Sequence, residues 1–276
     1  MSLKSNSQRT SKQAKEDHHI PNATRLIINL DRSHERLIHI QRQFEVHNLS
    51  FERVPAVDAL NIAPQTLDNI RKSYSPFITK ELSTAEIACF MSHMKCWQLV
   101  IDRKIKGAFI FEDDIALSKE GIPLLISENW IPENVDICQL GTCFQTPKKV
   151  SFRKIRQISE RFVITQNNTR TPVLGTQGYW ISSRGAKIAL KAASKGIPGP
   201  VDHFLFDPKF DIPHTLNVWT LSPAIAFEEK TLNSTIATER NKTNKCPVSI
   251  KNLIKIWWRK KTGKMLIKTL TRELAK

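Results

Sequence analysis

The sequence lacks any segment typical of membrane insertion or secretion. No apolar run approaches the roughly 20 residues that a transmembrane helix requires. Residues 1–20 also lack the apolar stretch of a secretory signal peptide. We therefore expect an intracellular protein.

Cysteine and glycine are scarce, and their spacing argues against several common sites. The five cysteines are odd in number and none forms a C-x-x-C pair, which argues against a disulfide framework and a structural zinc site. Buried thiols in a reducing compartment are the simpler interpretation. The nine glycines form no Gly-rich loop behind the first apolar run, so neither a dinucleotide fingerprint nor a P-loop is present.

Acidic residues are fewer than basic residues. The 276 residues include 42 Lys and Arg but only 26 Asp and Glu, which gives a net charge of +16. Such an excess implies polyanionic surroundings, which are phosphorylated substrates, anionic membrane or nucleic acid, and charge alone does not choose among them. A hydrophobic content of 40% is ample for the core of one large α/β domain, or of one domain with an appendage.

Strand and helix patterns alternate along the chain. Residues 25–30 read as a buried strand, and a helix with an apolar stripe follows a polar turn that Asp31 or Ser33 could cap. Further strands are predicted at 51–58, 136–141 and 217–227. Residues 175–182 place aromatics beside glycines, and a further helix is predicted at 184–195, closed by Gly196. Residues 60–82 are predicted to be irregular, and residues 144–170 to form an excursion or an edge hairpin.

A capping box marks another helix, because Ser83 is followed three residues later by Glu86. Ser92 and His93 lie in the middle of this helix, and His93 is a surface neighbour of Trp97 four residues on. Each of these residues is equally compatible with a purely structural role, Glu86 as a cap and His93 as a core-edge histidine.

Three consecutive acids, Glu112, Asp113 and Asp114, follow the apolar run 108–111. The run suits a strand in a sheet that is covered on both faces. Adjacent carboxylates repel one another unless a cation or solvent compensates them. The carboxyl ends of central strands are also where open α/β sheets bind ligands. The pattern therefore favours a divalent-metal and phosphate site, with a solvated turn as the alternative.

The two ends of the chain differ in composition from the middle. Residues 1–24 are polar and predict a disordered tail. Residues 250–276 interleave nine Lys and Arg with Leu, Ile and Trp, the pattern of a helix that lies on an anionic membrane surface. Nucleic-acid binding and a helix packed on the domain are the rival interpretations, and Trp257-Trp258 favours the membrane interface.

Six short motifs follow one another between residues 25 and 230. They are 28–33 with Arg36, 51–58, 82–89 with Ser92, His93 and Trp97, 111–114, 178–182, and 201–202. In this order they resemble glycosyltransferase family 25, the bacterial lipooligosaccharide and lipopolysaccharide glycosyltransferases, many of which are β-galactosyltransferases. Ala88 departs from the glycine that the family commonly has at its position.

The resemblance implies a GT-A-like fold, an α/β nucleotide-sugar-binding mixed sheet flanked by helices, over residues 25–235. The basic helical appendage would then occupy residues 236–276. The acceptor site is expected in the C-terminal half of the domain.

The resemblance also implies a metal site, because Glu112-Asp113-Asp114 is similar to the D-x-D element of GT-A enzymes. Asp114 would be the chief ligand of Mn²⁺ or Mg²⁺, and such all-oxygen ligation does not separate the two metals. Glu112 would bind the metal through water or contact the ribose, and Asp113 would either contribute to the donor site or have a structural role.

The remaining donor contacts are expected from two other motifs. Asn29, Arg32 and Arg36 would contact uracil, ribose or phosphate, for which the planar fork of arginine is suited. Ser92 and His93 would line the donor site.

Inversion by direct displacement, which the resemblance implies, needs a base to take the proton of the acceptor hydroxyl. Asp202 is the first candidate and Glu228 the second. Gly178 and Tyr179 would shape the sugar or acceptor pocket.

The sequence as a whole thus predicts an inverting, metal-dependent glycosyltransferase. It would move a hexose, most commonly in this family galactose from UDP-galactose, onto lipooligosaccharide or lipopolysaccharide at the inner face of the cytoplasmic membrane. The alternatives are a non-catalytic membrane- or polyanion-binding protein on a degenerate transferase scaffold, and a metal-dependent phosphohydrolase. The retained acids argue against degeneration, and no nucleic-acid partner is expected.

Overall fold

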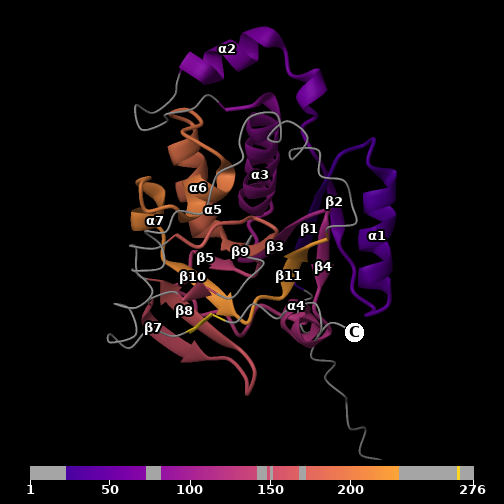
Figure 1. The fold of residues 1–276 in the computed structure, drawn as a ribbon, viewed down its shortest axis with the longest axis vertical. Coiled ribbons are helices and arrows are strands. Elements are labelled where there is room, and N and C mark those ends of the chain that lie inside the picture. Colours follow the sequence, from indigo (N-terminus) through magenta and orange to yellow (C-terminus); the bar gives the residue numbers. More distant parts are fainter. Residues whose placement is uncertain are drawn as a thin grey trace, which may run out of the picture.

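An eight-stranded mixed sheet forms the centre of the structure, a computed structural model that describes residues 23–72, 82–141, 148–149, 152–167, 172–229 and 266–267 (Figure 1). The strand order is β2-β1-β3-β9-β5-β10-β8-β7. The strands span Arg25–Asn29 (β1), Glu52–Pro55 (β2), Gly107–Glu112 (β3), Ile137–Gln139 (β5), Phe152–Gln157 (β7), Val163–Asn167 (β8), Gly178–Ser182 (β9) and Val218–Ser222 (β10). The sheet confirms the predicted α/β class.

Strand direction brings several strand ends to one edge of this sheet. β1 runs parallel to β2 and β3, whereas β9 is antiparallel to both β3 and β5. Phe111 pairs with Gly178, so β9 begins where β3 ends. The carboxyl ends of β1 and β3 therefore lie beside the start of β9, at the edge where α/β sheets bind ligands.

Alternation of side chains along the strands divides the core into two clusters, one on each face of the sheet. Leu26, Ile28 and Ile110 face the helices Thr84–Asp102 (α3), Ser183–Ala193 (α5), Val201–Phe206 (α6) and Ile212–Thr215 (α7). Ile27 and Phe111 face the helices His34–Glu45 (α1) and Ile122–Ile126 (α4), together with a small sheet of Ile115–Leu117 (β4) and Ala226–Glu228 (β11). Successive residues at a strand end therefore point to different helices.

The strands and helices predicted between residues 25 and 230 are present with shifted bounds, but one segment predicted to be irregular contains a helix. Residues 60–82 contain the 3₁₀ turn Ala59–Asn61 (η1) and the helix Pro64–Lys72 (α2), so the prediction of an irregular segment was wrong for residues 64–72. Pro64 is the first residue of α2, a position where its missing N–H and fixed φ suit a helix. A second 3₁₀ turn spans Lys119–Gly121 (η2).

Helix starts also differ in detail from the sequence patterns. The capping box of Ser83 and Glu86 is confirmed in both directions. Ser33 occupies the cap of α1, but its side chain makes no capping bond. Pro200 occupies the N-cap position of α6, and Asp202 lies in the first turn of this helix. Gly196 adopts a φ of 125°, which explains why glycine follows α5.

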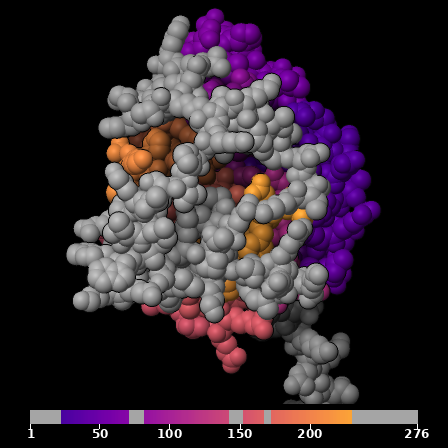
Figure 2. Space-filling view, in the orientation of Figure 1, coloured from indigo at the N-terminus to yellow at the C-terminus, as the bar shows by residue number. Residues whose placement is uncertain are grey.

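The strands β7 and β8 form the predicted edge hairpin, with β7 at the margin of the sheet. Its side chains from Arg153 to Gln157 are exposed. Atoms of this region, pink in the space-filling view, protrude at the bottom of the molecule (Figure 2).

The predicted terminal segments lie almost wholly outside the described residues. Leu266–Ile267 (β12) is the described part of the expected C-terminal helix, and it forms a two-residue strand paired with Lys148–Lys149 (β6). The prediction of a helix was therefore wrong for residues 266–267, and it stays a prediction for the rest of that segment, as does the disordered tail for residues 1–22. In the part of the chain that the structure describes, no helix is both long and apolar enough to cross a bilayer.

Candidate functional site

The acid triplet lies at the end of β3, where its side chains meet two different layers. Asp113 accepts hydrogen bonds from Asn29 Nδ2 at 2.7 Å and from Arg36 at 2.8 Å. Arg36 also lies 3.3 Å from Asp114. Asn29 ends β1 and Arg36 is on α1, so these contacts tie the turn after β3 to the helix on that face of the sheet.

Glu112 points to the opposite face, as the alternation along β3 requires. Its Oε1 accepts a hydrogen bond from Thr176 Oγ1 at 2.6 Å. The same oxygen lies 3.6 Å from Nε2 of His93 on α3. The triplet is therefore divided, with Glu112 on the α3 side and Asp113 with Asp114 on the α1 side.

A buried aromatic network holds His93 in place. The hydroxyl of Tyr179 lies 2.8 Å from His93 Nδ1 and accepts a hydrogen bond from Trp97 Nε1 at 2.9 Å. All three side chains are almost completely buried. Burial raises the pKa of Tyr179 well above its ordinary value, so its hydroxyl stays protonated and supports the imidazole.

The electrostatics of the two outer acids differ. Burial, and then the negative charge of Glu112, raise the pKa of Asp114 to about 7, although Arg36 opposes the rise. Burial acts on Glu112 in the same direction, but the pKa of Glu112 is lowered because contacts with His93 and Thr176 and the charge of Arg36 outweigh it. A cation beside Asp114 would relieve the repulsion that keeps this group protonated.

Most of the predicted donor-site residues line one pocket of about 160 Å³. This volume is smaller than the roughly 300–1,000 Å³ of a typical ligand pocket, so it accommodates part of a ligand. The lining residues named by the sequence are Arg32, Arg36, Ser92, His93, Glu112, Asp113 and Asp114. The structure thus brings seven predicted residues from three segments of the chain to one place.

Two of the predicted donor-site residues, Asn29 and Ser92, use their side chains in hydrogen bonds with other residues of the protein. Asn29 supports Asp113 and accepts a hydrogen bond from Arg53 Nε at 2.8 Å. Ser92 Oγ donates to the carbonyl of Ala88 and accepts from Val57 N, at 2.7 and 2.8 Å. These bonds position the walls of the pocket.

The predicted base and acceptor residues lie outside the lining of this pocket. Glu228 is on β11, and its charge contributes to the raised pKa of Asp114, so it lies beside the acid cluster. Asp202 lies on α6, whose Phe204 packs against Phe90 and Trp97 of α3.

Gly178 and Tyr179 lie in the packed interior of the sheet. A Cβ on Gly178 would come within 2.6 Å of the Phe111 ring, so glycine permits the close pairing of β9 with β3. The side chain of Tyr179 is completely buried, and its hydroxyl forms hydrogen bonds with His93 and Trp97. A role of this pair at the acceptor stays a prediction.

Sequence reasoning missed Thr176 and Cys89. Thr176 is brought to Glu112 because β9 starts beside the end of β3, and no local pattern marks this residue. Cys89 lines the pocket and precedes His93 by four residues on α3, a spacing that places two side chains on one helix face.

Comparison with known proteins gives a family match. The model of "Glycosyltransferase family 25 (LPS biosynthesis protein)" matches residues 22–205. The lacto-N-neotetraose biosynthesis glycosyltransferase LgtE of Neisseria meningitidis is 28% identical over 214 residues, which are 74% of this chain and 73% of that protein. The lipooligosaccharide biosynthesis protein lic2B of Haemophilus influenzae is 29% identical over 58% of this chain and 60% of its own length. Human procollagen galactosyltransferase 2 is 30% identical over 65% of this chain and 29% of its own length.

Proposed function

Because the chain belongs to glycosyltransferase family 25, we propose that it is an inverting, divalent-metal-dependent transferase that moves a hexose onto lipooligosaccharide or lipopolysaccharide. The observation that carries this proposal is the pocket that joins Arg32 and Arg36 to Glu112, Asp113 and Asp114. Cations and clustered carboxylates at the carboxyl ends of strands suit a nucleotide diphosphate that is bound together with a metal.

The positions of two arginines support a nucleotide-diphosphate donor in this pocket. Arg36 is held by Asp113 and Asp114, so its guanidinium is oriented before a ligand arrives, and Arg32 lies at the rim in an ion pair with Asp58. Both arginines can donate to phosphate oxygens of the donor. Such contacts hold the diphosphate and stabilise the negative charge that develops when the sugar leaves.

The carboxylates present fit a hard divalent cation. Burial, and then the charges of neighbouring acids, raise the pKa of Asp114, and a bound cation would oppose this rise. Asp114 and Glu112 would hold Mn²⁺ or Mg²⁺, which supplies Lewis-acid neutralisation of the leaving diphosphate when bound. Asp113 is occupied by Asn29 and Arg36, which favours a positioning role for it.

Inversion requires a base on the acceptor side. Asp202 remains a candidate as the acid of the motif on α6, and Glu228 is the second, supported by its position beside Asp114. In either case the carboxylate takes the proton of the acceptor hydroxyl as the oxygen attacks the anomeric carbon.

Galactose from UDP-galactose is the proposed donor. Support comes from the human relative, which is named a galactosyltransferase, and from the β-galactosyltransferases of the family that the motifs resemble. The basic segment 250–276 is proposed to hold the enzyme on anionic lipid at the inner face of the cytoplasmic membrane, where the acceptor would be presented.

A screen of nucleotide sugars with Mn²⁺ tests the function. The expected result is a thermal shift and donor turnover with UDP-galactose, and transfer to a truncated lipooligosaccharide acceptor. Cleavage of the diphosphate by water into a nucleoside monophosphate and a sugar phosphate, without transfer to a sugar acceptor, would identify a phosphohydrolase. Neither hydrolysis nor transfer with any nucleotide sugar would favour the non-catalytic alternative.

A further inference from the structure

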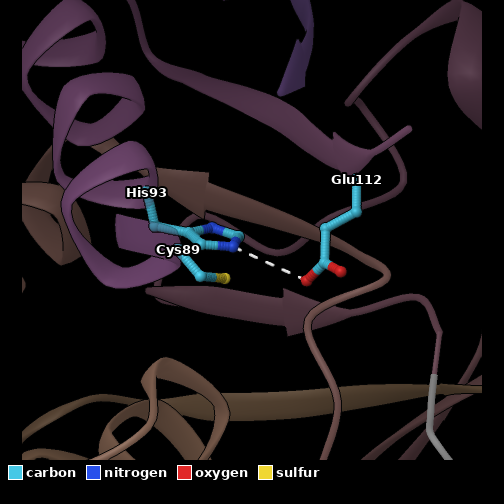
Figure 3. A group of neighbouring side chains, drawn as sticks. All are labelled: Cys89, His93 and Glu112. Atoms are coloured by element: carbon cyan, nitrogen blue, oxygen red, sulfur yellow. Dashed lines mark ion pairs between the residues drawn. The ribbon is translucent and has the colours of Figure 1, made fainter. Parts of the chain in front are cut away.

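Three side chains of different chemistry converge at the floor of the pocket. Cys89 and His93 project from one face of α3, and Glu112 projects from the end of β3 toward them (Figure 3). One ligand-type atom of each, a sulfur, a nitrogen and an oxygen, lies within 4.8 Å of the other two. Carboxylate–carboxylate repulsion plays no part in this cluster, so it differs in kind from the acid triplet.

His93 Nε2 is the atom around which the cluster is built. It is buried and makes no hydrogen bond with any described residue, which is unusual for a polar atom in a protein interior. Its neighbour Glu112 Oε1 lies at 3.6 Å, which is beyond a hydrogen bond. Two ligands that each lie about 2.0–2.2 Å from one tetrahedral ion are separated by about 3.4 Å. The gap between nitrogen and oxygen therefore matches the space that an ion would occupy.

The surroundings of His93 suit a metal ligand. With Nε2 on an ion, Nδ1 carries the ring proton and donates to the Tyr179 hydroxyl 2.8 Å away. That oxygen has two lone pairs, so it can accept from Trp97 and His93 together. A buried partner on the second ring nitrogen fixes the tautomer and orientation of metal-bound histidines.

We propose that Cys89, His93 and Glu112 form a three-ligand site for a thiophilic divalent cation of the Zn²⁺ class. Thiolate and imidazole prefer Zn²⁺ to Mn²⁺ and Mg²⁺, whereas the all-oxygen acids of the donor site prefer the latter two. Three protein ligands leave a fourth position open, as in zinc sites that bind water or substrate. Cys89 is half-buried and lines the pocket, so an ion reaches the site from solvent. Binding releases the Cys89 thiol proton to solvent.

Glu112 is a ligand in this site and also in the proposed Mn²⁺ or Mg²⁺ site of the donor. When Zn²⁺ is bound, Glu112 is therefore not available to the donor metal. The site itself does not depend on the proposed transfer, because its test measures binding by the protein alone. Cobalt is the probe, since Co²⁺ takes zinc positions and a cysteine thiolate bound to it absorbs in the near ultraviolet.

The experiment titrates the full-length, reduced, metal-free protein with Co²⁺. We expect a thiolate-to-cobalt charge-transfer band that saturates at one equivalent and disappears when Zn²⁺ is added. Cys89→Ser should abolish the band, whereas the matched variants Cys143→Ser and Cys246→Ser should keep it. Glu112→Gln should keep the band but weaken cobalt binding about tenfold or more, and the exposed control Glu133→Gln should not.

Two outcomes would overturn the proposal. One is the absence of a thiolate band at saturating Co²⁺, and the other is a band that survives Cys89→Ser unchanged. Metal-free thermal unfolding of each variant checks that the fold is kept. If Cys89→Ser does not fold, the comparison of Glu112→Gln with Glu133→Gln decides, and equal cobalt affinities would refute the site.

Discussion

The guanidinium of Arg36 lies 2.8 Å from the carboxylate of Asp113, across 77 positions of sequence. Both side chains are nearly buried, with 12% and 9% of their surface exposed. The pair connects α1 to the turn after β3 and leaves the same guanidinium 3.3 Å from Asp114. Arg36 therefore compensates part of the negative charge of Asp113 and Asp114 before any ligand binds.

Removing Arg36 should destabilise the fold. Arg36→Met leaves Asp113 buried without its cation, which costs about 3–5 kcal/mol for a buried pair. The matched control is Arg32→Met, because Arg32 is 48% exposed in its pair with Asp58 and should cost at most about 1 kcal/mol. Urea unfolding of both variants measures the difference, and equal costs would contradict the structural role of Arg36.

Asp114→Asn should abolish transfer while the fold survives. The amide keeps the volume of the side chain but removes the charge that the proposed metal site requires, so a rate loss on the order of 10²-fold or more is expected. The control is Asp102→Asn at the exposed end of α3. Transfer at a near-normal rate by Asp114→Asn, measured with donor and Mn²⁺, would remove it as a metal ligand.

The stability of the metal-free protein should fall between pH 4 and pH 7 through Asp114. Its pKa is raised from 3.8 to about 7, so the folded protein holds a proton that the unfolded chain has released. The favourable contribution is present at low pH and is lost as the pH rises through this window. A shift of about three units corresponds to at most about 4 kcal/mol.

The variant Asp114→Asn isolates this effect from other titrating groups. In EDTA, the difference in free energy of unfolding between wild type and variant should change by a few kcal/mol from pH 4 to pH 8, in favour of the variant at high pH. A pH-independent difference would show that Asp114 ionises normally.

Kinetic measurements should show which of Asp202 and Glu228 is the catalytic base. The variant of the true base, Asp202→Asn or Glu228→Gln, should retain donor binding and lose turnover by about 10²–10⁴-fold. The other variant should keep most of its turnover. Isothermal titration with the donor diphosphate and a steady-state transfer assay distinguish them, and normal turnover by both would exclude this pair of candidates.

Deletion of residues 250–276 should weaken binding to anionic vesicles. The segment carries nine Lys and Arg, and each cation near an anionic surface contributes about 1 kcal/mol at most. Sedimentation with phosphatidylserine vesicles at low and high salt provides the measurement, with neutral vesicles as the control. Unchanged, salt-insensitive binding by the shortened protein would place the membrane contact elsewhere.

Local patterns predicted the elements of the fold better than their exact starts. The capping box at Ser83 and the apolar strands are properties of short segments, and they are present as expected. Pro64 was misleading because proline ends helices but also begins them, and Leu67 and Ile70 of α2 pack on the core.

The site depended on contacts between distant segments. Motif order brought Arg36, His93 and Glu112 into one hypothesis, and all three line the pocket. The burial of Tyr179 beneath His93 followed from the pairing of β9 with β3, which no single segment specifies. The direction of Glu112 could have been anticipated from alternation along β3, whereas Asp113 and Asp114 lie in the turn after the strand, where alternation no longer applies.

The exposed strand β7 has a consequence for how molecules meet one another. A marginal strand offers unsatisfied backbone groups on which a second chain can add and start aggregation. Here Arg153, Lys154 and Arg156 stand along that margin, beside an Ile155 that is 48% exposed. Two copies that approached margin to margin would set cations against cations in a protein of net charge +16. Mutual repulsion should therefore oppose pairing of two copies through β7 at low ionic strength, and added salt should weaken this repulsion.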